Sequence, residues 1–74
     1  MLQLESLVYR SGDLWLEASW LTLLELSQKE PLNKIRVYKA ARNVFQLLAE
    51  VEADAEAEND IAELCRGTVE YLLQ

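Results

Sequence analysis

The side chains that could carry out chemistry are few and of limited kinds. The sequence of 74 residues has no histidine and a single cysteine, Cys65. Without histidine or a second cysteine, the usual zinc ligand sets and histidine-based catalytic triads cannot form. Cys65 falls on an apolar helical stripe, where a free cysteine usually acts as a small buried hydrophobe. Because the chain also lacks a glycine-rich phosphate loop, we expect a protein that is not an enzyme and holds no cofactor.

An acidic tract over residues 50–60 is the candidate for binding a metal cation, because hard cations take clustered carboxylates. The acids that match the first three ligand positions of an EF-hand loop are Asp54, Glu56 and Glu58. The position that such loops reserve for glycine holds Asn59, and the twelfth position holds Cys65 in place of glutamate. The motif therefore fails, and we expect no metal site.

Three cations at a spacing of three residues, Arg36, Lys39 and Arg42, form what we call the basic face. Side chains at this spacing on a helix could follow a phosphate backbone. The adjoining turns are acidic, however, and the formal net charge of −6 repels polyanions. Nucleic acid is therefore not the expected partner, and a small nucleic-acid-associated regulator that uses the basic face is the alternative function.

Length and composition limit the classes of protein to which the chain can belong. The chain is 51% hydrophobic with two glycines and one proline, which argues against both disorder and a turn-rich β fold. A chain this short forms at most one domain and buries only about 60% of its unfolded surface. The start lacks the basic region of a signal peptide, and no apolar run approaches the roughly 20 residues that span a bilayer. We expect a single helical domain over residues 1–74, cytoplasmic, with no membrane segment.

Hydrophobic periodicity predicts three main helices, over residues 13–29, 32–57 and 60–73. Asp13 can cap the first helix, and Pro31 is tolerated in or just before the first turn of the second. Asp60 and Glu63 match a capping box at the start of the third. The expected fold class is therefore all-α: a small up-down bundle of three helices, with an N-terminal segment docked beside them.

The first third of the chain permits two interpretations. Ser11 and Gly12 could form a hairpin turn that pairs strands within residues 5–18. The alternating apolar residues that support this hairpin are Leu7, Tyr9, Leu14 and Leu16. An isolated hairpin is marginal in water, whereas the leucine-rich run up to Leu26 suits a helix. We expect the helix, with residues 2–10 forming a leading helix and Gly12 marking a break.

Two features indicate that one copy of the chain does not bury all of its apolar surface. The helix at 13–29 is apolar all round, and the stripe of the helix at 32–57 spans about 200°, wider than one-sided packing needs. Charge is also segregated: residues 29–49 carry five cations against one acid, and residues 50–74 carry one cation against eight acids. An antiparallel copy would bring the opposite charges together. The sequence thus predicts a homodimer.

The predicted function is that of a non-enzymatic helical protein-interaction module, of the adaptor, small chaperone or inhibitor type. It would present helical surface to a second copy and to another protein. Trp15 and Trp20 point to different sides of one helix, and Trp20 is the preferred interface residue because several leucines adjoin it. The full set of predicted interface residues is Leu16, Trp20, Leu23, Leu24, Val37, Val44, Leu47 and Val51.

Overall fold

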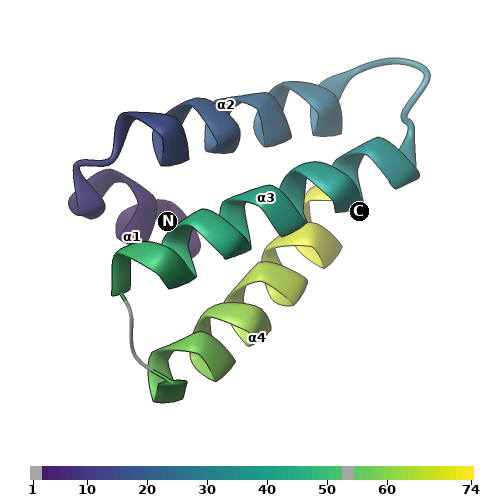
Figure 1. Ribbon diagram of the computed structural model, residues 1–74. Helices are drawn as coiled ribbons and strands as arrows, with labels where there is room; N and C mark the ends of the chain where they lie inside the picture. Colours follow the sequence, from purple (N-terminus) through teal and green to yellow (C-terminus); the bar gives the residue numbers. More distant parts are fainter. Residues whose placement is uncertain (1–2, 53–54) are drawn as a thin grey trace.

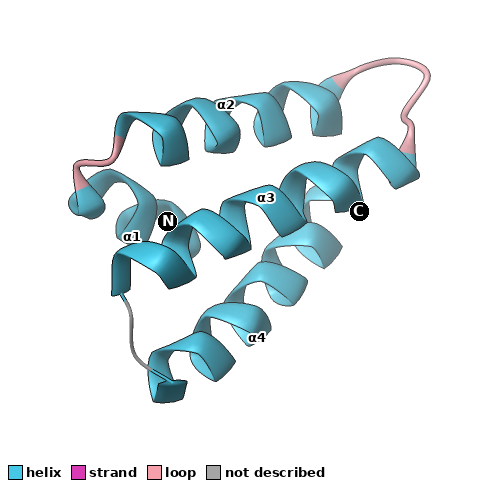
Figure 2. Ribbon diagram, in the orientation of Figure 1, coloured by secondary structure: helices cyan, strands magenta, loops and turns pink. Residues whose placement is uncertain are grey.

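The computed structural model describes residues 3–52 and 55–74, with the backbone alone for 55–58. Four helices pack together (Figure 1), and none of the described residues forms a strand (Figure 2). The helices are α1, Gln3–Ser11; α2, Leu14–Gln28; α3, Lys34–Glu52; and α4, Ala55–Leu72. The all-α class is confirmed, and α1 is the leading helix expected over residues 2–10, beside the three main helices.

Three consecutive residues, 11–13, form the corner between α1 and α2. Because helices lie on both sides of this corner, the hairpin considered within residues 5–18 is excluded. Gly12 has a φ of +71°, a left-handed conformation that glycine adopts readily just past a helix end. The Ser11 hydroxyl donates to the Val8 carbonyl oxygen at 2.7 Å and so closes the last turn of α1. Asp13 accepts a hydrogen bond from the Leu16 backbone N–H at 2.9 Å, which makes it the N-cap of α2 as predicted.

The loop at residues 29–33 connects α2 to α3, which lie side by side in Figure 1. Lys29 ends α2, and its backbone N–H donates to the Leu26 carbonyl oxygen. The Asn33 side chain then accepts a hydrogen bond from the Arg36 backbone N–H at 3.2 Å. Asparagine is a favoured N-cap residue, which explains why α3 begins at Lys34, two residues later than the predicted start at 32.

The boundary between the last two helices differs from the prediction. Because α3 ends at Glu52 and α4 begins at Ala55, the acidic tract is divided between two helices. Asp60 and Glu63 lie inside α4, so the expected capping box at 60 is wrong. Alanine and glutamate are strong helix formers, and their density here explains why α4 begins five residues before the predicted start. The predicted break between 57 and 60 is therefore helical.

The core lies around α3, which packs most extensively against α2 and α4, while α1 contacts all three of the other helices. The buried apolar side chains follow the predicted stripes of the last two helices. They are Leu4 and Val8 of α1; Leu16, Trp20 and Leu23 of α2; Val37, Ala40, Ala41, Val44 and Leu48 of α3; and Ile61, Cys65 and Val69 of α4. A single continuous cluster thus joins all four helices.

Candidate interaction surfaces

The core of a single chain takes up most of the predicted interface. Five of the eight residues are fully buried in it: Leu16, Trp20, Leu23, Val37 and Val44. Two more, Leu24 and Leu47, are half-buried and pack against that core. Val51 alone is exposed, at 40%. The periodicity located the apolar positions correctly, but most of them face other helices of the same chain.

The opposite side of α2 is where apolar side chains reach the surface. Leu14, Trp15 and Leu21 are exposed at 78%, 79% and 55%. We define the outer face of α2 as Leu14, Trp15, Ala18, Leu21, Thr22 and Glu25, all of them exposed. At 100° per residue these positions fall on one side of the helix, away from the buried stripe of the same helix. This surface has no covering element among the described residues.

The sequence held a signal that distinguishes the two tryptophans. Trp20 lies four residues after Leu16 and three before Leu23, so it is in phase with the two leucines that join it in the core. Trp15 is out of phase with that stripe and falls to the solvent side. In the single chain, Trp20 is therefore a core residue, and Trp15 is the exposed one.

The charges on α2 all have one sign. Its ionisable residues are Glu17, which is half-buried, and Glu25, which is exposed on the outer face. Asp13, the N-cap, adds a third carboxylate at the start of the helix. The outer face of α2 is thus an apolar surface with an acidic border, and a cation follows only at the C-cap of the helix, Lys29.

A second surface, which we call the α3–α4 groove, lies between the last two helices and has a volume of about 390 Å³. Its lining residues are Tyr38, Ala41, Arg42 and Phe45 of α3, with Ala62, Cys65, Arg66, Val69 and Glu70 of α4. The small side chains Ala41, Ala62 and Cys65 leave the space, and the exposed Arg42 and Arg66 border it. The groove is therefore apolar inside with two guanidinium groups and one carboxylate at its rim.

Cys65 contributes to the packing beneath this groove. Its Sγ donates to the Ala41 carbonyl oxygen at 3.2 Å, a contact that links α4 to α3. Burial raises the pKa of the Cys65 thiol, because the thiolate would lose its hydration. Nucleophilic attack needs the thiolate, so this environment disfavours reactivity. The prediction that Cys65 is a buried hydrophobe on its stripe is confirmed.

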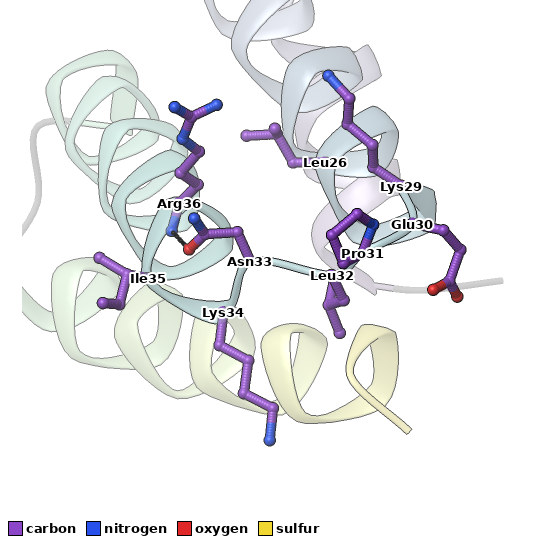
Figure 3. A pocket seen from close by; sticks show the side chains of 9 residues that line it. All are labelled: Leu26, Lys29, Glu30, Pro31, Leu32, Asn33, Lys34, Ile35 and Arg36. Carbon is purple, nitrogen blue, oxygen red and sulfur yellow. Dashed lines mark hydrogen bonds between the residues drawn. The ribbon is translucent and has the colours of Figure 1, made fainter.

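A third hollow, of about 500 Å³, lies beside the loop between α2 and α3 (Figure 3). Its charged side chains come from Lys29, Glu30, Lys34 and Arg36. Figure 3 shows these four chains pointing in different directions, with no common point at which their charged ends meet. The arrangement does not concentrate charge on one ligand atom. Among the described residues, no group of three or more metal-ligating side chains is gathered anywhere on the molecule.

The basic face is exposed at all three positions. Lys39 and Arg42 border a shallow hollow of about 330 Å³ that Asn43 and Gln46 complete. A spacing of three residues turns each successive side chain by about 60° around the helix, so Arg36 and Arg42 lie about 120° apart. Arg42 consequently belongs to the rim of the α3–α4 groove as well, and the three cations do not form one straight row.

Within the described part of the chain, no helix is both long enough and apolar enough to cross a bilayer. Comparison with protein-family models, with curated proteins and with solved structures finds no match for this chain.

Proposed function

We propose that this chain is a non-enzymatic helical interaction module that works by self-association, as a homodimer in the simplest case. In this proposal the four helices form an up-down bundle that a second copy completes. The outer face of α2 is the observation that supports it. Leu14, Trp15 and Leu21 have no role in the core of the single chain, yet they occupy two consecutive turns of one helix.

The physical argument rests on the cost of leaving this surface in water. Burying a large apolar side chain contributes roughly 1.5–3 kcal/mol relative to leaving it exposed. Contiguous apolar patches on small proteins mark interaction sites, and tryptophan is enriched among the residues that dominate binding energy. Trp15 stands 79% exposed beside Leu14 on the same face. A partner that covers the outer face of α2 therefore gains a tryptophan anchor with leucine neighbours.

The role that follows is to present helical surface to protein partners, as an adaptor, a small chaperone or an inhibitor does. Helix-mediated recognition uses apolar anchors at i, i+3, i+4 and i+7. Leu14, Ala18 and Leu21 have this spacing on α2. A second copy of the chain and another protein can use the same recognition, because both would read the same row of side chains.

Light scattering over a dilution series tests the proposal. We expect the full chain to have more than the monomer mass at high concentration and to dissociate on dilution. Leu21→Lys should lower the apparent association constant about tenfold or more, since it places an ammonium group in a buried contact. The new ammonium group would stand four residues from both Glu17 and Glu25, so the helix itself should not be weakened.

Ile35→Lys is the matched control for this experiment. Ile35 is an exposed aliphatic residue, at 69%, but lies at the start of α3 and outside the outer face of α2. We expect this variant to associate like the wild type. A wild-type chain that stays monomeric at high concentration, or two variants that weaken association equally, would refute the proposal.

The alternative function, a nucleic-acid-associated regulator, draws its support from the exposure of Arg36, Lys39 and Arg42. It requires salt-dependent binding of DNA or RNA that Arg36→Glu with Lys39→Glu abolishes. The net charge of −6 opposes such binding. We therefore expect fluorescence anisotropy with a labelled duplex and a labelled single strand to show no binding at physiological salt.

A further inference from the structure

We infer that the outer face of α2 of one copy docks into the α3–α4 groove of a second copy. The inference rests on the proposed self-association and names its two surfaces. It joins the outer face of α2 and the α3–α4 groove in one contact. The groove is formed only by α3 and α4, and the docking surface only by α2, so each copy carries both halves of the contact.

The two surfaces agree in length. Leu14 and Leu21 are seven residues apart, or two helical turns of about 10.5 Å in total. The lining of the groove covers a similar length, from Tyr38 to Phe45 on α3 and from Ala62 to Glu70 on α4. Small side chains on its floor let the ridge of a third helix approach two neighbouring helices.

The two surfaces also agree in charge. Arg42 and Arg66 stand exposed at the rim of the groove, and neither guanidinium makes an ion pair or a hydrogen bond with any described residue. The helix proposed to dock carries Glu17 and Glu25 and no cation. Glu70 is the single carboxylate in the lining of the groove, and Arg66, four residues before it, is placed to offset it. Docking therefore brings acids to unpaired arginines.

The same charges disfavour the simplest rival, in which two copies pair through their α2 helices. Such a pair would bring the acids Glu17 and Glu25 of two copies together, with a cation only at the C-cap of each helix, Lys29. Docking of α2 into the groove instead joins two different surfaces. A contact of this kind leaves the second groove and the second α2 free, unless the two copies exchange both contacts reciprocally. This property makes complementation of two defective variants the decisive test.

The experiment uses the full chain with one surface disabled at a time. The first variant, Trp15→Ala with Leu21→Lys, disables the outer face of α2 and keeps the groove. The second, Arg42→Glu with Arg66→Glu, disables the groove and keeps α2. We expect each variant to be monomeric by sedimentation velocity at a concentration where the wild type associates. We expect their mixture to form a one-to-one complex, because each variant supplies the surface that the other lacks.

Arg36→Glu with Lys39→Glu is the control for charge. It changes the net charge by the same amount as the groove variant, but neither residue lines the groove. This control should associate like the wild type. Far-UV circular dichroism checks that every variant is helical, and Arg42→Gln with Arg66→Gln replaces the groove variant if charge reversal unfolds it.

The outcomes separate the inference from the proposal on which it rests. If the groove variant alone still associates like the wild type, or the mixture of the two defective variants stays monomeric, the inference is overturned while self-association stands. If the wild type itself is monomeric, the inference and the proposed function both fail. Loss of association in both single-surface variants, with recovery in their mixture, supports the inference.

Discussion

The inner and outer sides of α2 carry the same kinds of side chain and have opposite surroundings. Trp20 is fully buried against the other helices, whereas Trp15, five residues earlier on the same helix, is 79% exposed. Leucines flank both of them. The phase of the helix separates the two tryptophans, and the outer side differs further because it carries Thr22 and Glu25.

This difference shows that the residues on the outer face of α2 contribute nothing to the core of the single chain. Leu16, Trp20 and Leu23 fill the space above α3, and no described helix covers the other side of α2. Composition alone would assign both tryptophans to one core. Because one of them remains outside, the energetic roles of the two can be separated by experiment.

The largest expected effect is on the stability of Trp20→Ala relative to Trp15→Ala. Truncating a buried tryptophan costs about 3–5 kcal/mol, whereas an exposed substitution usually stays within about 0.5 kcal/mol. Urea unfolding of dilute, monomeric protein, followed by circular dichroism, measures both. Comparable losses in the two variants would contradict the assignment of inner and outer sides.

The environment of Trp20 makes a milder variant informative as well. Within the described chain, its indole Nε1 is buried without a hydrogen-bond partner, which costs about 1–3 kcal/mol. Trp20→Phe removes this unpaired donor and keeps an aromatic ring. We therefore expect Trp20→Phe to be destabilised by much less than Trp20→Ala in the same urea experiment. Equal losses would contradict the expectation that the phenylalanine ring fills most of the space of the tryptophan.

The next prediction concerns pH and the floor of the α3–α4 groove. Burial raises the pKa of the Cys65 thiol above its ordinary value of 9.0. The folded state then keeps a proton that the unfolded state releases, so stability falls as pH rises above about 9, by at most about 1.4 kcal/mol per pH unit. Cys65→Ser replaces the thiol with a hydroxyl that does not ionise in this range, so the wild type should lose stability relative to this control as pH rises. Parallel pH profiles for the two proteins would contradict the assignment.

Asp13 is the N-cap of α2 and so determines where the helix, with its buried and exposed sides, begins. Asp13→Ala removes the hydrogen bond to the Leu16 N–H and should cost about 1 kcal/mol. Asp13→Asn keeps an acceptor at the same position and should retain most of that stability. Thermal unfolding of the two variants measures the difference. If alanine and asparagine behave alike, the side chain at 13 does not cap α2.

The smallest expected effect lies on the outer side of α4, which is polar where that of α2 is apolar. Gly67 is exposed, and a Cβ added there would meet nothing within 4 Å. Gly67→Ala should therefore stabilise the monomer by about 0.5–1 kcal/mol through helix propensity alone. It should leave self-association unchanged. A loss of stability would indicate that the space beside Gly67 is occupied.

Much of the fold could be predicted because periodicity is a local property of the sequence. The apolar stripe that contains Cys65 is buried as predicted, and Asp13 caps α2 as predicted. The start of α4 was missed because alanine and glutamate favour helix throughout the acidic tract, so that Asp60 resembled a cap inside a continuous helix. The Asn33 cap was missed because Pro31 is a stronger local signal for a helix start.

The candidate site was harder to predict because it depends on how helices pair. Periodicity identifies which side of α3 is apolar, but not whether α2, α4 or a second copy covers it. The α3–α4 groove arises where Ala41 meets Ala62 and Cys65 across two helices. Local periodicity does not indicate that residues so far apart in sequence lie next to each other. The exposure of Trp15 could have been predicted from the sequence, because Trp15 falls on a different side of the helix from Leu16 and Leu23.

The central claim is that the outer face of α2 is covered when two copies meet. Iodide quenching of Trp15 fluorescence across a dilution series tests it most directly, in the Trp20→Phe variant, where Trp15 is the remaining tryptophan. We expect Trp15 to be shielded from iodide at high protein concentration and accessible on dilution. Quenching that is equally strong at every concentration would contradict the claim.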